Sequence, residues 1–423
     1  MGAQEFDVIV YGATGFTGRL VAEYLQQTYG TEGEVRWAMA GRDITKLRTV
    51  SSQIGAPMSL TLIAADARDA NALEALAHRA RVIITTVGPY QLYGEPLLAA
   101  CVRAGTDYVD LCGEPNWMAA MIQKYDAQAK QSGARIVFSC GFDSIPFDLG
   151  VFFLQQHMQE RLGAPADVVR GRVRKMKGGF SGGTLASLLA SVDAANRDPG
   201  VKRTMADPYA LSPQSIVPQP SGDKVIYDAD IPSWSTPFVM AAINTKNVHR
   251  SNALLGYPYG RSFTYDEMQM TGDGDDGKKR ANAAASQSRT QSALLGFAPT
   301  RALLRRFALP KPGEGPSKEE RETGFYDIMF VGETAKGEKL TASVKGDKDP
   351  GYGSTSKMIT EAALCLADTS RAQTPGGVWT PAAAMGASLV DRLQARSVLR
   401  FALEDKDAPR RAHPLPPDYQ ASV

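Results

Sequence analysis

The strongest constraint on the fold is a glycine-rich turn near the start of the chain, between an expected strand at residues 6–11 and an expected helix at residues 15–29. Gly12, Gly15 and Gly18 stand at every third position of this turn. The first glycine permits a tight exit from the strand, the second lets the backbone approach a pyrophosphate, and the third permits close helix–strand packing. Free N–H groups at the helix N-terminus suit phosphate oxygens. The pattern predicts a dinucleotide-binding unit; the alternative is an ordinary tight turn.

The alternation of strands and helices continues to residue 139. We expect strands at 6–11, 35–40, 60–64, 81–86, 108–111 and 135–139, and helices at 15–29, 43–53, 69–78, 93–104 and 115–132. Strands that alternate with helices form crossover units, and such units build a parallel sheet that is covered on both faces. The fold class is therefore α/β, with a Rossmann-type, doubly wound parallel sheet whose ligand binds at the carboxyl ends of the strands.

The pattern changes after residue 150, and the length of 423 residues also predicts more than one domain. We expect an NADP-binding Rossmann domain at 1–150, an α+β substrate domain at 151–345, and C-terminal helices with a polar tail at 346–423 that pack back on the first domain. Short strands are expected at 168–173, 224–227, 325–332 and 340–344, and helices at 354–367 and 380–394. We interpret residues 272–279 and 309–322, which are rich in glycine, proline and charge, as loops.

Composition excludes several classes of protein. A net charge of +2 gives no reason to expect a nucleic-acid partner. The four cysteines lack Cys-x-x-Cys spacing and the four histidines lack metal-ligand spacing, which predicts reduced thiols and no metal site. The chain has no targeting signal and no apolar run of about 18 residues, so we expect a cytoplasmic protein.

The end of the second strand indicates which dinucleotide binds. An NAD site usually places an acidic residue there for the ribose 2′-hydroxyl, whereas this chain has Arg42, with Lys46 one turn further on. A guanidinium can bind a 2′-phosphate through two hydrogen bonds, which favours NADPH. Asp66 is expected on the adenine side. The expected cofactor-binding residues are Gly12, Thr14, Gly15, Phe16, Thr17, Gly18, Arg42, Lys46, Asp66, Val87, Gly88 and Pro89.

Three further turns end at the same edge of the predicted sheet, at residues 88–94, 110–114 and 139–148. Tyr90, Glu114 and Asp143 are the candidate catalytic acids there, because a buried carboxyl or phenol can donate a proton after hydride transfer. Structural roles are the alternatives. Tyr90 could only pack on the cofactor, and Asp143 and Asp148 could cap the helix that follows.

Several motifs along the chain resemble the saccharopine dehydrogenase-like oxidoreductases, and within them the trans-acting enoyl reductase branch. They lie at residues 11–18, 88–95, 107–114, 140–146, 251–257, 309–317, 349–353 and 376–386. The resemblance implies an NADPH-dependent reductase of a carbon–carbon double bond in a lipid or polyketide-type acyl intermediate. The alternatives are an amino-acid dehydrogenase acting on a secondary amine or imine, and a non-catalytic NADPH-binding protein.

The expected partners follow from that resemblance and from one segment. The resemblance implies an acyl-lipid or other small-molecule substrate, presented by a synthase or carrier, and we also expect a homodimer. Residues 293–309 combine leucine, phenylalanine and arginine in a helical pattern, which suits peripheral contact with a membrane surface. The alternative for this segment is a helix whose apolar face covers the substrate domain.

Overall fold

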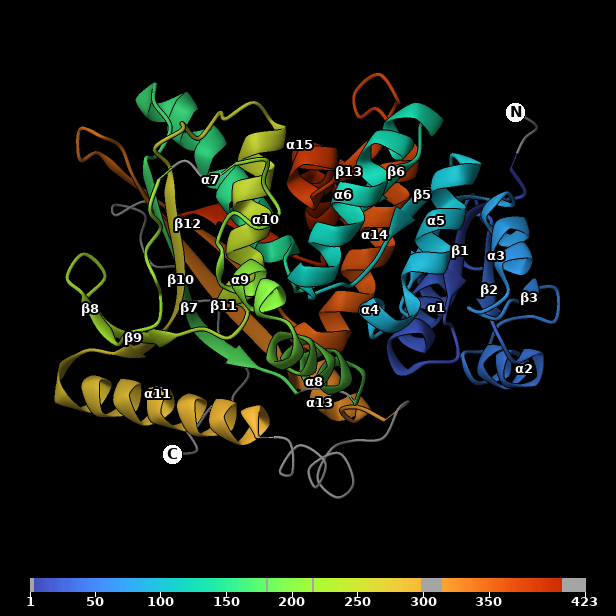
Figure 1. The fold of residues 1–423 in the computed structure, drawn as a ribbon, viewed down its shortest axis with the longest axis horizontal. Helices are drawn as coiled ribbons and strands as arrows, with labels where there is room; N and C mark the ends of the chain where they lie inside the picture. Colours follow the sequence, from blue (N-terminus) through green and yellow to red (C-terminus); the bar gives the residue numbers. More distant parts are fainter. Residues whose placement is uncertain (1–3, 180–181, 215–216, 298–313, 405–423) are drawn as a thin grey trace.

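Two seven-stranded sheets form the framework of the molecule and lie next to each other in Figure 1. The computed structural model describes residues 4–179, 182–214, 217–297 and 314–404. The first sheet is entirely parallel, in the order β13-β6-β5-β4-β1-β2-β3. Its strands are β1 (Phe6–Tyr11), β2 (Trp37–Gly41), β3 (Leu62–Ala64), β4 (Ala80–Thr85), β5 (Asp107–Val109), β6 (Arg135–Val137) and β13 (Gly377–Trp379). The strand order reverses direction between β1 and β4, and a dinucleotide binds at such a switch point.

Both faces of the first sheet are buried, as its continuous apolar strands predict. Val8 and Val10 of β1 pack into one cluster and Ile9 into another. The helices that follow the strands are α1 (Phe16–Tyr29), α2 (Ile44–Gln53), α3 (Ala70–Ala77), α4 (Tyr90–Tyr93), α5 (Glu95–Ala104) and α6 (Pro115–Ser132). A further helix, α14 (Thr355–Asp368), returns from the C-terminal part of the chain and packs against α1, β1, β4 and β5.

The second sheet is mixed, with the order β14-β12-β11-β7-β10-β9-β8 and one parallel pair, β7 with β10. Its strands are β7 (Val168–Lys177), β8 (Ile226–Asp228), β9 (Ser233–Pro237), β10 (Thr264–Gly272), β11 (Phe325–Glu333), β12 (Lys339–Gly346) and β14 (Arg400–Leu403). Besides α7 (Ile145–Leu162), the further helices in the described ranges are α8 (Gly182–Arg197), α9 (Pro199–Ala206), α10 (Ala241–Leu254), α11 (Gly274–Gly296), α13 (Lys318–Thr323), the π-helix η1 (Pro350–Ser354) and α15 (Pro381–Ala395).

Helix α7 (Ile145–Leu162) leads from the first sheet to the second and packs on β11, β12 and α15. The helix approaches β11 closely at Gly150, where an added Cβ atom would lie 2.4 Å from the Phe330 ring. Helix α10 packs beside α7 and donates a hydrogen bond from Asn247 to Ser144 (2.7 Å), at the start of α7. These helices place the second sheet against the carboxyl edge of the first.

The predicted architecture is confirmed: a Rossmann-type sheet, a second α+β unit, and C-terminal helices that return to the first sheet. Four strands were not predicted: β9, β10, β13 and β14. Polar residues interrupt the apolar pattern of β9 and β10, and the three and four residues of β13 and β14 are too few to show a pattern. The loop prediction for residues 272–279 is wrong, since α11 begins at Gly274. Asp273 caps this helix, and Asp275 and Asp276 in its first turn complement the helix dipole.

The predicted loop at 309–322 also contains a helix, α13, which begins with a capping box between Ser317 and Glu320. Of the segment expected to contact a membrane, residues 298–309 lie outside the described residues, and the rest forms the end of α11. No helix in the described part of the chain is long and apolar enough to span a membrane.

Candidate functional site

The glycine turn between β1 and α1 has the geometry of a phosphate-binding loop. Gly12 has a φ of +87°, which side chains other than glycine rarely adopt, and its N–H donates to the Ala40 carbonyl of β2 (2.9 Å). At Gly18 an added Cβ atom would lie 2.2 Å from the Gly12 oxygen, so only glycine permits α1 to approach the turn. The first and third glycines are therefore required by the fold itself.

Gly15 is different, because the space beside it is open. Its φ of −76° is accessible to any residue, and an added Cβ atom would meet a single atom within 4 Å, the Gly12 oxygen at 3.2 Å. Gly15 is also the N-cap of α1, and no side chain caps this helix. Open space in front of an uncapped helix N-terminus fits a pyrophosphate.

Arg42 and Lys46 lie together beyond the end of β2. Both side chains are exposed, and neither forms an ion pair among the described residues. The N-cap Asp43 holds the start of α2, since its carboxylate accepts from the N–H groups of Thr45 and Lys46 (3.0 and 3.1 Å). The cationic groups of Arg42 and Lys46 remain available to a 2′-phosphate.

Asp66, after β3, already has a partner within the protein. Its carboxylate pairs with Arg68 at 3.0 Å, and this hydrogen-bonded guanidinium lowers the pKa of Asp66 to about 2. A contact between Asp66 and the adenine end of a cofactor therefore stays a prediction. Thr14, Phe16 and Thr17 lie in the glycine turn and the first turn of α1, and Phe16 packs edge-on against Tyr352 of η1 with ring centroids 5.1 Å apart.

Val87, Gly88 and Pro89 follow β4, on the other side of the switch point. The turn is fixed to the glycine loop by Thr86, whose N–H donates to the Tyr11 carbonyl (3.1 Å). Helix α8 of the second unit approaches it closely, because an added Cβ atom at Gly88 would lie 3.4 Å from Ser187 Oγ. A ligand that crosses Gly88 would therefore meet both units.

Tyr90 and Glu114 are both buried and both engaged in hydrogen bonds. The Tyr90 hydroxyl donates to the Thr85 carbonyl (3.2 Å) and accepts from Leu111 N–H (3.1 Å), and burial raises its pKa well above 10. Glu114 is 1% exposed, and its two oxygens accept from the N–H groups of Tyr90 (2.9 Å) and Gln91 (3.0 Å). Neither side chain presents a free proton to the edge of the sheet.

Asp143 has the properties of a proton donor. It follows β6, keeps partial exposure to solvent, and forms no side-chain hydrogen bond within the described part of the chain. Its Oδ2 lies 3.4 Å from the place that a Cβ atom would take at Gly113. Loss of contact with solvent raises its pKa to about 7, so the protonated form is favoured far more than in an ordinary aspartate.

The alternative prediction, that Asp143 and Asp148 cap α7, is wrong. Ser144 occupies the N-cap position, and no side chain caps this helix. Asp148 instead accepts from Ser251 Oγ (2.5 Å) and from Ala382 N–H (2.9 Å) at the start of α15. Asp148 therefore joins α7, α10 and α15, whereas Asp143 has no such structural role.

Asp110 is a residue of this edge to which the sequence analysis assigned no role. One of its oxygens accepts from Cys112 N–H (2.9 Å) and Ser139 N–H (3.0 Å), and the other accepts from the Tyr108 hydroxyl (2.9 Å). Its carboxylate thus ties the turn after β5 to the turn after β6. A carboxylate directly after a buried strand was the available signal, but the sequence does not show which turn it would reach.

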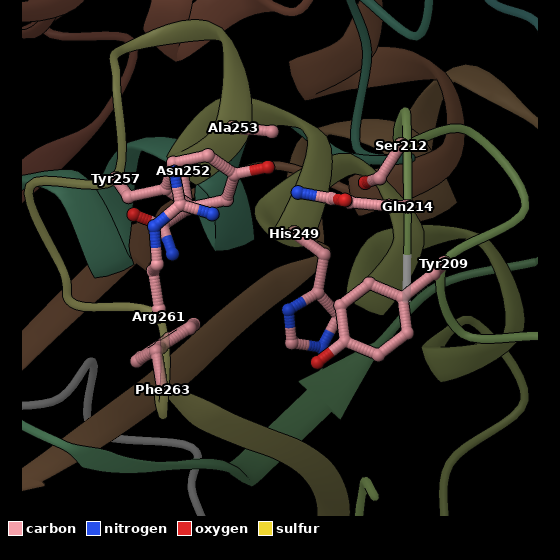
Figure 2. A pocket seen from close by; sticks show the side chains of 9 residues that line it. All are labelled: Tyr209, Ser212, Gln214, His249, Asn252, Ala253, Tyr257, Arg261 and Phe263. Carbon is pink, nitrogen blue, oxygen red and sulfur yellow. The ribbon is translucent and has the colours of Figure 1, made fainter. Parts of the chain in front are cut away.

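Two cavities lie away from these turns. The first, of about 10 Å³, has room for about one water molecule and is lined by residues that include His249, Ser212 and Tyr209 (Figure 2). His249 Nε2 and Ser212 Oγ have no hydrogen-bond partner among the described residues, and burial lowers the pKa of His249 to about 4. The cavity is too small for an acyl group.

The second cavity, of about 490 Å³, lies at the opposite, amino edge of the first sheet. It is lined by residues that include Asp7 and Arg81, at the starts of β1 and β4, and Arg392 of α15. No group of three or more potential metal ligands occurs in the described ranges. The candidate active site is therefore the carboxyl edge between the glycine turn and Asp143.

A parallel sheet with a phosphate-binding turn at its switch point, and an unpaired acid beyond it, defines a dinucleotide-dependent oxidoreductase. Residues 8–137 match the family model described as the saccharopine dehydrogenase NADP binding domain. A Mycobacterium tuberculosis protein provisionally named a trans-acting enoyl reductase is 41% identical, and the alignment covers 93% of this chain and 97% of that protein. A Mycobacterium leprae trans-acting enoyl reductase is 37% identical, with 94% and 97% covered.

The chain belongs to the family of trans-acting enoyl reductases within the saccharopine dehydrogenase-like proteins. It is an NADPH-dependent oxidoreductase. The apo saccharopine dehydrogenase of Saccharomyces cerevisiae has the same fold, with a TM-score of 0.54 and 13% identity over 95% of this chain and 100% of the yeast chain.

Proposed function

We propose that this protein reduces the carbon–carbon double bond of an α,β-unsaturated acyl thioester, which a synthase or carrier presents in trans. The observation that carries the proposal is Asp143, an unpaired carboxyl group with a pKa of about 7 at the cofactor edge of the sheet. The names of the relatives, trans-acting enoyl reductases, support the reaction and the separate synthase.

The roles of the residues follow from their positions. The N-terminus of α1 and the open space at Gly15 would hold the pyrophosphate, and Arg42 with Lys46 would hold the 2′-phosphate. Gly88, between Ser187 and Tyr90, would lie against the nicotinamide side of the cofactor. When bound, NADPH would supply the hydride for the β-carbon of the substrate. Asp143 would donate its proton to the α-carbon, so that the saturated thioester forms, and its carboxylate would regain a proton from solvent.

The function can be tested by following NADPH oxidation against two panels of compounds. We expect turnover with enoyl thioesters, because in the proposed reaction Asp143 protonates the carbanion that hydride addition creates. Turnover with an imine formed from an amino acid and an oxo acid, in place of the enoyl thioesters, would contradict the proposal. Binding of NADPH without turnover of either panel would favour a non-catalytic role.

Replacement of Arg42 by alanine should reduce the preference for NADPH. A charge-assisted hydrogen bond contributes roughly 1.5–3 kcal/mol, so we expect NADPH binding to weaken about tenfold or more while NADH binding stays unchanged. Fluorescence titration of both nucleotides measures the two affinities. Arg103→Ala is a matched control, since this arginine is paired with Glu74 (3.0 Å) and neither residue is assigned to the cofactor. Equal affinities of the wild type for NADPH and NADH would refute the assignment.

A further inference from the structure

Glu114 uses its side chain in an unusual way for its position. It is the N-cap residue of α6, yet its carboxylate forms no hydrogen bond with the first turn of that helix. The carboxylate reaches instead to the neighbouring turn after β4, where its two oxygens accept from the first two N–H groups of α4, those of Tyr90 and Gln91. A residue in the turn after β5 therefore holds the turn after β4.

The contacts around Glu114 reach all three turns of the candidate active site. Its own N–H contacts Cys112 Sγ at 3.4 Å, and Cys112 N–H donates to Asp110, which also holds the turn after β6. Pro89 is the N-cap residue of α4, and its own side chain forms no capping hydrogen bond. The next residue, Tyr90, donates its N–H to Glu114 Oε1 instead. The conformation of Gly88–Pro89 thus depends on the Glu114 carboxylate, which lies in the turn after the neighbouring strand β5.

We propose that Glu114 is a positioning residue, which holds the turn at Gly88–Pro89 in the conformation that receives the nicotinamide half of the cofactor. The inference rests on the proposed function only in assigning the nicotinamide to this side of the switch point. A proton-donor role fits Glu114 poorly, because both oxygens already accept hydrogen bonds and the residue is 1% exposed. Protonation would place a hydrogen against one of the two N–H donors.

The proposal separates the two halves of the cofactor. The 2′-phosphate half would lie at Arg42 beyond β2, on the other side of β1, where no contact with Glu114 exists among the described residues. Loss of the Glu114 carboxylate should therefore change binding of the whole dinucleotide and leave binding of adenosine 2′,5′-bisphosphate unchanged. A general destabilisation of the fold would instead weaken binding of both ligands.

The test is titration of Glu114→Gln with NADPH and with adenosine 2′,5′-bisphosphate. The amide keeps one acceptor and turns an NH₂ group toward the other N–H donor. We expect NADPH binding to weaken about tenfold, which corresponds to one lost charge-assisted hydrogen bond, with unchanged bisphosphate binding and altered fluorescence of the bound NADPH. Glu114→Asp keeps the charge but shortens the reach, and should show the same selective loss if the Gln variant fails to fold.

A matched control exists at the amino edge of the same sheet. Glu361 is equally buried, at 0% exposure, and its carboxylate binds Tyr24, Tyr29 and Arg392. Glu361→Gln should lower the melting temperature without changing the fluorescence of bound NADPH. The proposal would be overturned if the Glu114 variants bound NADPH and adenosine 2′,5′-bisphosphate with equally reduced affinity, or if their affinity for NADPH were unchanged. Both readouts are binding, so a failure to reduce enoyl thioesters would leave this test intact.

Discussion

Asp143→Asn is expected to lower kcat by at least about 100-fold, the usual contribution of a positioned general acid. Asparagine has nearly the shape of aspartic acid but cannot supply the proton. Because Asp143 forms no side-chain hydrogen bond within the described residues, the substitution breaks no contact there that holds the fold. We therefore expect unchanged NADPH affinity, and stopped-flow measurement of NADPH oxidation would show the loss in the chemical step.

The pH dependence supplies a second readout for Asp143. Burial raises its pKa from 3.8 to about 7, and the protonated form is the active one, so kcat of the wild type should fall as the pH rises through about 7. The same shift means that Asp143 lowers stability as the pH rises from about 4 to 7, since the folded state holds the proton more tightly than the unfolded state. Asp143→Asn should remove that loss of stability.

Asp148→Asn is the matched control for this experiment. Burial raises the pKa of Asp148 to about 7 as well, but its oxygens accept from Ser251 and Ala382. This variant should be less stable and should keep the fall of kcat near pH 7. An unchanged kcat in Asp143→Asn would exclude Asp143 as the proton donor.

The sequence predicted the first sheet well because its signals are local. The alternation of strand and helix fixes a parallel sheet, and Asp43 and Asp69 mark helix starts through caps formed within three residues. The glycine spacing is also a local signal, although the packing that requires two of these glycines is not: an added Cβ atom at Gly12 would lie 2.6 Å from Val87, and one at Gly18 would lie 2.7 Å from Thr86 Oγ1. The sequence shows the spacing but not these contacts with the turn after β4.

The roles of the acidic residues depend on contacts that the sequence does not contain. Glu114 and Asp143 follow neighbouring strands and look equivalent as buried acids in turns. The structure distinguishes them, because Glu114 binds two N–H groups more than 20 residues earlier in the chain, whereas Asp143 remains unpaired among the described residues. The start of α11 was missed for another reason: glycine and aspartate favour both turns and helix N-termini.

The glycine turn gives the last prediction, a contrast between two substitutions. Gly15→Val should fold and lose NADPH binding, because the backbone at Gly15 is accessible to any residue and the added side chain would occupy the open space in front of α1. Loss of two charge-assisted phosphate contacts costs about 3–6 kcal/mol, so the affinity should fall on the order of 100-fold or more.

Gly18→Val should instead destabilise the fold, since its Cβ atom would lie 2.2 Å from the Gly12 oxygen and 2.7 Å from Thr86 Oγ1. Thermal denaturation followed by NADPH titration measures both properties for each variant. A side chain at Gly15 would need only a small shift of the Gly12 oxygen, 3.2 Å away, and would otherwise obstruct a ligand, whereas one at Gly18 forces α1 away from β1. If Gly15→Val kept its fold and bound NADPH normally, the phosphates could not lie in front of α1, and the cofactor would have to bind elsewhere along the carboxyl edge.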